Sequence, residues 1–520
     1  MTHGDLNEDI LTPLAFGVCA PIDSFEPVAF DDFASALRQT LDDGGRVLSL
    51  FARSTSEAQQ WTLVAVLARR HASEAAGQDP ARASLVGGDY SFSLGVVCAR
   101  VGQSYPSLTP RSPALHLFER DLHERCGIVP EGHPWLRPVR HWPSDGGDAT
   151  QPWPMYELEG PEVHEVRVGP VHAGVIEPGH FRFQCHGERV FRLEIALGFQ
   201  HRGLLAQLVG GPHRHTLAQM ETVAGDTSVG HAWAHAQVVE ALSQVCVSPR
   251  ADALRVCGLE LERLANHVGD LGALAGDVGF LPTASYCGGL RGDLLNLSAM
   301  ISGSRLGRGL VRVGGVGFDL DDELTGSMRE RLRSIGEAAE RANLLLWASP
   351  SSTGRFEGTG TVPPEVARSL GLVGFAARAS GVDIDVRRCF PTQTYSDHPV
   401  RHWLKEQGDV YARGRMRWRE AEASFAFLDQ VLDELPEGDL RVAPTELSPD
   451  SLAVGLVEGW RGEICHIGLT DAQGRFEAYE IVDPSFHNWT GLEMALRGAE
   501  ISDFPLCNKS FNLSYAGHDL

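Results

Sequence analysis

The segment from about residue 230 to 435 limits the fold more than any other part of the sequence, because its apolar residues recur at helical spacing. Three long runs carry this pattern, at 256–271, 321–347 and 411–435. Together they predict a largely helical domain. The apolar faces of the first two runs consist of Leu261, Leu264, Val268 and Leu271, and of Leu324, Met328, Leu332 and Ile335.

Patterns typical of strands precede this helical segment. They lie at 164–168, 180–185 and 189–197, and His186-Gly187 between the last two suits a hairpin turn. We therefore expect the helical domain to begin with an antiparallel sheet. A further α+β segment is expected from about residue 452 onward.

A stretch rich in proline, glycine and polar residues, 143–154, is the best candidate for a linker. The residues before it, from about 30 to 142, indicate a compact α/β unit. We expect helices over 33–41 and 60–72, and a strand over 91–101.

A chain of 520 residues is longer than one hydrophobic core usually serves, so two or more domains are expected. The prediction is an α+β protein in three parts. An N-terminal α/β domain covers 1–142, a linker covers 143–160, and a largely helical domain with an N-terminal antiparallel sheet covers 161–520.

The chain is strongly acidic, with a formal net charge of −23. The electrostatic field of so much negative charge repels phosphate backbones and anionic lipid headgroups, so nucleic acid is not an expected partner. No run approaches the ~20 consecutive apolar residues of a spanning helix, and the first residues do not resemble a secretory signal. We therefore expect a cytoplasmic protein whose ten cysteines are reduced thiols, and no two of these form a C-x-x-C pair.

Several short strings in a fixed order carry a family resemblance over nearly the whole chain from about residue 85 onward. They lie at 105–109, 118–121, 127–137, 169–172, 177–182, 199–203, 260–267, 408–413, 458–463 and 503–506. Together they resemble the fused large subunit of formate hydrogenlyase and other group 4 membrane-bound [NiFe]-hydrogenases. That family is similar to the quinone-site subunit of respiratory complex I fused to its small hydrophilic neighbour.

The resemblance also assigns the metal ligands. Hydrogenases of this family hold nickel and iron with four thiolates from two C-x-x-C motifs, and soft thiolates suit such a redox metal. The corresponding positions here are Ala224, Thr227, Ser514 and Gly517. Because none of them is a cysteine, we expect no metal centre and no cofactor held by this chain, and no hydrogenase chemistry.

The resemblance implies roles for other residues at the former metal site. Glu177 resembles the proton-conducting glutamate of hydrogenases, Arg461 the arginine that overhangs the metal, and His180 the loop histidine near the quinone headgroup in complex I. Asp226 and Tyr515 could occupy the vacated space, with His180 and Tyr515 in a quinone pocket. Functional residues and structural relics remain equally acceptable interpretations of this cluster.

The resemblance implies a soluble-arm subunit on the cytoplasmic side of the cell membrane. Its expected partners are an iron–sulfur small subunit with a [4Fe–4S] cluster and antiporter-like and quinone-site-type membrane subunits. Its expected role is electron transfer to quinone, or redox- or proton-coupled ion translocation, within an oxidoreductase related to NADH-quinone oxidoreductase. The alternative is a scaffold subunit of the same kind of complex without a redox role.

A third hypothesis concerns zinc. His231 and His235 are four residues apart on a predicted helix and could bind zinc together with His213 or His215. No acid completes an H-E-x-x-H pattern, so histidines satisfied by ordinary hydrogen bonds are the better interpretation.

Overall fold

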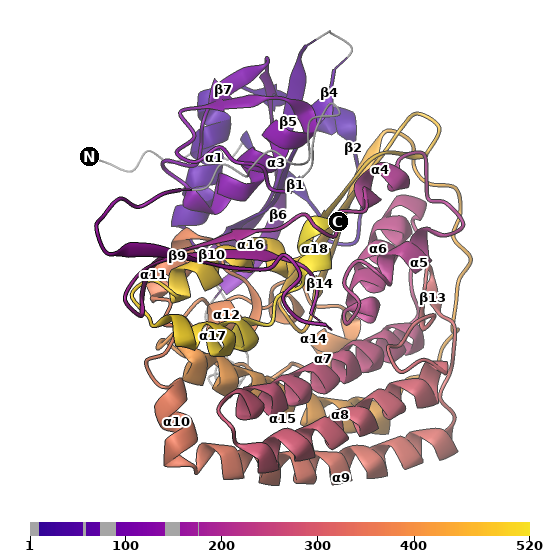
Figure 1. Ribbon diagram of the computed structural model, residues 1–520. Coiled ribbons are helices and arrows are strands. Elements are labelled where there is room, and N and C mark those ends of the chain that lie inside the picture. The colour runs from indigo at the N-terminus through magenta and orange to yellow at the C-terminus, as the bar shows by residue number, and fades with distance from the viewer. Residues whose placement is uncertain (1–9, 56–58, 73–89, 141–155, 175) are drawn as a thin grey trace.

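The computed structural model describes residues 10–55, 59–72, 90–140, 156–174 and 176–520 (Figure 1). The α+β class is confirmed. Strands and two helices of the N-terminal part lie at one end of the molecule, and long helices lie at the other. Residues 141–155, which include most of the predicted linker at 143–160, lie outside the described residues, so the division of the chain there stays a prediction.

The N-terminal part is built on a five-stranded sheet with the path β1-β6-β5-β4 and β3 beside β6. Helices α1 and α3 pack on this sheet. The bounds of these elements are β1 Thr12–Leu14, β3 Pro27–Val28, α1 Phe30–Asp42, β4 Arg46–Ser54, β5 Trp61–Ala72, β6 Tyr90–Val101 and α3 His116–Cys126. A short parallel pair, β7 (Ser104–Pro106) and β8 (Val129–Glu131), lies beside them.

The helix predicted over 60–72 is wrong, because this segment is strand β5 in the middle of the sheet. Its apolar run is short, and such a run is compatible with either a helix or a buried strand. Antiparallel pairing with β4 on one side and with β6 on the other decides the outcome. The predicted helix over 33–41 and the strand over 91–101 are confirmed.

The antiparallel sheet predicted after the linker is confirmed, with the order β11-β10-β9. Its strands are β9 Val163–Val168, β10 His180–His186 and β11 Arg189–Ala196. The pairing of His186 with Arg189 closes the predicted hairpin around Gly187, whose φ is 57°.

Long helices form the opposite end of the molecule, where α7, α8, α9 and α15 pack against one another (Figure 1). Their buried apolar side chains form one cluster, which confirms the helical domain predicted from the periodicity. The long helices are α6 Ser228–Ser243, α7 Pro249–Asp277, α8 Leu281–Ser302, α9 Asp322–Trp347 and α15 Val410–Asp433. Shorter elements connect them: α4 Leu204–Leu208, α5 Thr216–Met220, β12 Val311–Arg312, β13 Gly315–Val316, α10 Pro350–Phe356, α11 Pro364–Ser369, α12 Gly374–Arg378, α13 Val386–Cys389 and α14 Gln393–Asp397.

A last sheet joins the two ends of the chain. Its order is β16-β15-β14-β2, so a strand from near the N-terminus extends a sheet from the C-terminal segment. The bounds are β2 Ala20–Pro21, β14 Ser451–Glu458, β15 Glu463–Thr470 and β16 Phe476–Val482, followed by α16 Pro484–Ala495, α17 Phe504–Phe511 and α18 Tyr515–Asp519. Residues of this sheet and of the N-terminal sheet bury their apolar side chains in one common cluster.

None of the helices in the described ranges combines the length and the apolar character that crossing a bilayer requires.

Candidate functional site

Arg461 is the centre of the candidate site. It lies in the tight turn between β14 and β15, and its side chain is only 4% exposed. Two of its nitrogens hold the carboxylate of Asp226, just before α6, with Nη1 at 2.6 Å from Oδ1 and Nη2 at 2.8 Å from Oδ2. The third nitrogen, Nε, donates to the carbonyl oxygen of Asn512 at 2.6 Å. One guanidinium therefore ties together the turn before α6 and the C-terminal segment.

Trp460 completes the support of this ion pair. The guanidinium of Arg461 lies over its ring, 3.9 Å from the centroid, and the indole N–H donates to the backbone oxygen of Asp226 at 3.1 Å. Burial opposes ionisation of the Asp226 carboxyl, but the charge and hydrogen bonds of Arg461 outweigh it and hold its pKa below the usual range. The pair is therefore ionised at neutral pH.

The four positions that the resemblance assigns to metal ligands lie in the two segments joined by Arg461. Thr227 Oγ1 lies 3.3 Å from Nη1 of Arg461, and Ala224 is fully buried. The hydroxyl of Ser514 accepts the backbone N–H of Gly517 at 2.9 Å and so begins α18. A Cβ on Gly517 would lie 2.6 Å from Cγ of Asp483. This set of donors does not fit a centre held by thiolates, because no thiol is present and its hydroxyls are used elsewhere.

Glu177 approaches the site from the loop before β10. Its Oε2 accepts the backbone N–H groups of Tyr515 and Ala516, at 3.1 and 3.4 Å. Burial nevertheless raises the pKa of the Glu177 carboxyl above its usual value, against the opposing effect of these two amides. A half-buried acid with a raised pKa keeps its proton to a higher pH than an exposed glutamate, which suits a proton donor.

His180 and Tyr515 lie next to this loop. His180 opens β10 and is half-buried, and burial lowers the pKa of its imidazole. The ring of Tyr515 packs 4.8 Å from that of Trp489, between centroids, and burial raises the pKa of its phenol to about 12. A Cβ on Gly179 would lie 2.5 Å from Cε1 of Tyr515, so only glycine fits there. The structure thus gathers the predicted residues in one region, while their roles stay predictions.

Sequence reasoning missed several polar residues of α7 that face this region. Asn512 Nδ2 donates to Asp270 Oδ1 at 2.6 Å, and Arg417 lies 2.6 Å from the other oxygen of Asp270. Glu262 accepts the N–H groups of Val229 and Gly230 at the start of α6, at 2.8 and 3.3 Å. Burial raises the pKa of Glu262 to about 8. The sequence did contain a sign of them, because these two acids interrupt the apolar pattern of the helix.

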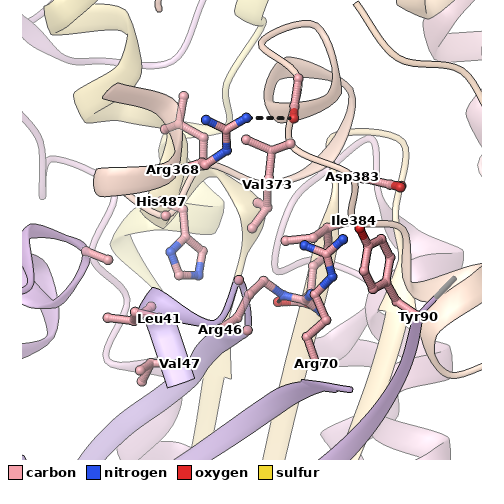
Figure 2. A pocket seen from close by; sticks show the side chains of 18 residues that line it. Leu41, Arg46, Val47, Arg70, Tyr90, Arg368, Val373, Asp383, Ile384 and His487 are labelled. Carbon is pink, nitrogen blue, oxygen red and sulfur yellow. Dashed lines mark hydrogen bonds and ion pairs between the residues drawn. The ribbon is translucent and has the colours of Figure 1, made fainter. Parts of the chain in front are cut away.

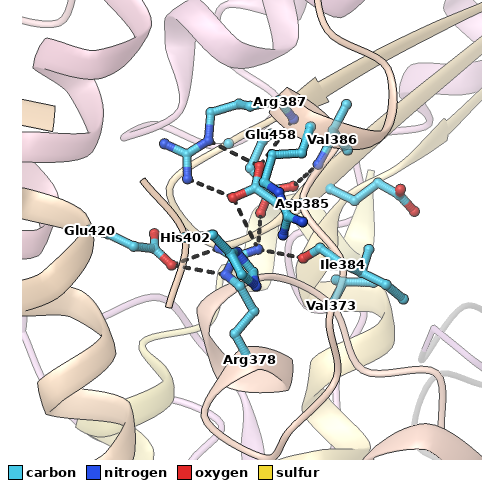
Figure 3. Close-up of polar contacts among 12 residues, drawn as sticks. Val373, Arg378, Ile384, Asp385, Val386, Arg387, His402, Glu420 and Glu458 are labelled. Carbon is cyan, nitrogen blue, oxygen red and sulfur yellow. Dashed lines mark hydrogen bonds and ion pairs between the residues drawn. The ribbon is translucent and has the colours of Figure 1, made fainter. Parts of the chain in front are cut away.

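A dense cluster of buried charges surrounds Arg378 (Figure 3). Arg378 is held by Glu420 at 2.7 Å and by Glu458 at 2.8 Å, and Arg387 by Asp385 at 2.7 Å. Burial, and then repulsion from Asp385, raises the pKa of Glu458 to about 7. Burial also opposes ionisation of Glu420, but Arg378, His267 and Arg263 together outweigh it and lower the pKa of that carboxyl. Buried carboxylates with pKa values displaced in opposite directions are typical of proton-transfer sites.

His267 connects this cluster to the candidate site. Its Nε2 lies 3.0 Å from Oε2 of Glu420, and Arg417 Nη1 lies 3.3 Å from its Nδ1. Because Arg417 also holds Asp270, polar contacts continue from the region of Asn512 to the cluster around Arg378.

A second polar chain leads away from the site through α6, β15 and β16. His231 Nε2 lies 3.0 Å from Asp483 Oδ2, and its Nδ1 lies 3.0 Å from Nε2 of His466. The hydroxyl of Tyr479 lies 3.0 Å from Nδ1 of His466 and 2.8 Å from Nδ1 of His235. All five residues are at most 1% exposed. We call this row of side chains the histidine chain.

The zinc hypothesis is wrong. His231 and His235 face the same interior, as their spacing indicated, but their partners belong to β15, β16 and the residue before α16. His213 and His215 are exposed in the loop before α5. Within the part of the chain that the structure describes, no three His, Cys, Asp or Glu side chains are grouped to hold a metal.

Comparison with known proteins supports the family resemblance that the sequence carries. A family model described as "Respiratory-chain NADH dehydrogenase, 30 Kd subunit" matches residues 30–152, and one described as "Respiratory-chain NADH dehydrogenase, 49 Kd subunit" matches residues 277–451. Formate hydrogenlyase subunit 5 of Escherichia coli (strain K12) is 30% identical over 440 residues, which cover 80% of this chain and 77% of that protein.

Other relatives have related names. NADH-quinone oxidoreductase subunit 4 of Thermus thermophilus is 29% identical, covering 66% of this chain and 90% of its own length. Membrane-bound hydrogenase subunit alpha of Pyrococcus furiosus is 27% identical, covering 65% and 83%. A chain of the membrane-bound sulfane sulfur reductase, an archaeal respiratory membrane complex, shares the fold, with a TM-score of 0.65 at 23% identity over 70% of this chain and all of that one.

Proposed function

Because the chain belongs to the family of fused group 4 hydrogenase large subunits that includes formate hydrogenlyase subunit 5, we propose that it is the peripheral large subunit of a membrane-bound, complex-I-like oxidoreductase. The names of its relatives support this placement. In this proposal it lies on the cytoplasmic side of the cell membrane. Its neighbours are an iron–sulfur small subunit with a [4Fe–4S] cluster and antiporter-like and quinone-site-type membrane subunits.

The proposed subunit works without nickel and iron of its own. The contacts of Arg461 are the observation that carries this proposal. Its guanidinium pairs with Asp226 and also donates to the carbonyl oxygen of Asn512, so it links the two segments where the resemblance places thiolates. The hydroxyl of Ser514 caps the N-terminus of α18, and Gly517 has little room for a side chain beside Asp483. Such an arrangement favours a site that handles protons and charge rather than a soft metal.

The reaction we propose is the reduction of a quinone, which takes up two electrons and two protons to become a quinol. The electrons come from the cluster of the small subunit, and side chains of this subunit deliver the protons. Glu177 is suited to the last proton transfer because burial raises its pKa above the usual value. His180, whose lowered pKa keeps the imidazole neutral, can donate a hydrogen bond to a quinone oxygen.

The histidine chain supports the proton-coupled part of this proposal. One set of tautomers lets every link donate in the same direction. In that set His235 donates to Tyr479, Tyr479 to His466, His466 to His231, and His231 to Asp483. A uniformly oriented chain can pass a proton by successive shifts, and it ends at the carboxylate that packs against Gly517 in the C-terminal segment.

A scaffold without a redox role is the second candidate. The packing of Tyr515 favours it, because the ring fills the space beside Gly179 and Trp489 instead of lining an open pocket. In this version Glu177 holds α18 through the two backbone amides and Arg461 closes the adjacent turn.

Elemental analysis and quinone reduction by the purified native complex distinguish these functions. We expect no nickel and about four irons per complex, for one [4Fe–4S] cluster. Glu177→Gln should lower the quinone reduction rate at least tenfold, whereas Glu188→Gln, a matched change in the exposed β10–β11 hairpin, should not. Nickel near one per chain would contradict the metal-free site, and full activity of Glu177→Gln would favour the scaffold.

A further inference from the structure

A cavity of about 390 Å³ lies between the N-terminal sheet and the second half of the chain (Figure 2). One wall comes from the α1–β4 turn and from Arg46, Arg70 and Tyr90 of β4, β5 and β6. The other wall comes from residues near α11 and α12 and from His487 of α16. Its volume falls within the range of ~300–1,000 Å³ that is usual for small-molecule sites. None of the residues of the candidate redox site lines it.

The carboxylates that line the cavity are already paired. Glu463 accepts from Nε of Arg46 at 3.2 Å, and Asp383 is held by Arg388 at 2.9 Å and by His402 at 2.8 Å. Neither carboxylate is therefore free to neutralise a further cation in the cavity.

Positive charge in the cavity remains uncompensated. Arg70 lies over the ring of Tyr90, and Arg368, across the cavity in Figure 2, only donates to the carbonyl oxygen of Gly381 at 3.4 Å. Among the residues that the structure describes, neither arginine forms an ion pair with a carboxylate. Nη1 of Arg46 and Nε of Arg70 are buried without a hydrogen-bond acceptor. Arg46 itself is only 6% exposed, so this donor has no access to bulk water.

Apart from His487 and the phenol of Tyr90, the rest of the lining is largely apolar. It includes Leu41, Val47, Leu372, Val373, Val382 and Ile384. A ligand that satisfied the arginines and also filled this space would carry one negative group on a hydrocarbon body. A single charge suits the site better than several, because the protein as a whole is strongly acidic.

We propose that this cavity binds a small amphiphilic carboxylate, whose head accepts hydrogen bonds from Arg46 and Arg70 and whose hydrocarbon body lies against Val373, Val382 and Ile384. Arg368 attracts the anion from the exposed side of the cavity. This binding is independent of the proposed redox function, since it uses none of the same residues.

Isothermal titration calorimetry of the full chain with octanoate tests the proposal, with octanol and acetate as probes for the body and the head alone. We expect octanoate to bind at least tenfold more tightly than either. Arg70→Met and Arg368→Met should each weaken octanoate binding about tenfold, and Val373→Phe should abolish it by filling the cavity. Arg111→Met, at an exposed position outside the cavity, is the control and should bind as the parent does.

Three results would overturn the proposal. They are the absence of octanoate binding, equal binding of octanol or acetate, and unchanged binding in both Arg70→Met and Arg368→Met. Thermal unfolding shows whether each variant is folded. If Arg70→Met does not fold, Arg368→Met still tests the proposal, because Arg368 is exposed and its replacement disturbs no core packing. Quinone reduction by the complex is measured separately, so failure of one proposal does not count against the other.

Discussion

Arg461 and Asp226 form an ion pair with two parallel hydrogen bonds, of 2.6 and 2.8 Å, that fastens the β14–β15 turn to the turn before α6. The arginine is almost fully buried, while the aspartate keeps about a third of its side chain exposed, at 35%.

Replacing Arg461 by methionine removes the partner of a half-buried carboxylate. Because Asp226 remains partly hydrated, we expect a loss of about 1–2 kcal/mol in the free energy of unfolding, less than for a fully buried pair. Urea denaturation at neutral pH measures it. Arg333→Met, which breaks the exposed pair with Asp429, should change the free energy by less than about 0.5 kcal/mol. Equal losses of unfolding free energy in the two variants would show that the buried pair stabilises the protein no more than the exposed one.

Glu262 should make stability fall as pH rises. Its pKa is raised to about 8 in the folded protein, so the folded state retains a proton that the unfolded state has lost. The stabilisation is complete below the ordinary pKa of glutamate, near 4.5, and is lost as pH rises through about 8. Glu262→Gln has no carboxyl group to titrate, so it lacks this pH dependence. Urea denaturation between pH 5 and 8, as a rough range set by these pKa values, should give a flatter curve for Glu262→Gln, and parallel curves would contradict the assignment.

Tyr479→Phe interrupts the histidine chain with little change in volume. It leaves Nδ1 of His466 and Nδ1 of His235 without their shared partner, at a cost of about 1–3 kcal/mol in the free energy of unfolding. If the chain carries protons, quinone reduction by the complex should also slow at least tenfold, with a larger solvent deuterium isotope effect. Tyr411→Phe, on α15, is a control outside the histidine chain. A stability loss with an unchanged rate would restrict the chain to a structural role.

Gly517→Ala should destabilise the protein by about 1–3 kcal/mol, because the new Cβ would lie within 2.6–2.9 Å of the carboxylate of Asp483. Asp483 cannot move freely, since it is bonded to His231 and to the backbone N–H of Ser485. Gly225→Ala is the matched control, because a Cβ there meets nothing within 4 Å. Thermal unfolding compares the two variants, and a neutral Gly517→Ala would show that the contact relaxes without cost.

The long helices could be predicted from the sequence, because an amphipathic face over several turns has few alternative interpretations. The run 256–271 lies within α7, the run 321–347 is α9 with its N-cap Asp321, and the run 411–435 lies within α15 apart from its last two residues. The run 60–72 could not be assigned in the same way. Its residues are buried by neighbouring strands that begin at Arg46 and Tyr90, and these neighbours are not visible in a local pattern.

The candidate site shows the same limit. Asp226 and Arg461 were predicted individually, from their place in family strings, but nothing local indicated that they pair across more than two hundred residues. The spacing of His231 and His235 gave the helix face, and the preferred interpretation of hydrogen-bonded histidines is confirmed, but the spacing did not indicate their partners. The true partners, His466 and Tyr479, lie on strands far along the chain, so only the fold brings them together.

The pairing of β2 with β14, through Ala20 with Leu452 and Pro21 with Ser451, has a consequence for synthesis on the ribosome. The sheet that receives β2 is translated near the end of the chain, so the N-terminal part must wait with that edge and much of its apolar cluster uncovered. The shared sheet is therefore completed only after β14 has been made. Until then, the apolar side chains that the two parts share have no partners from the later strands.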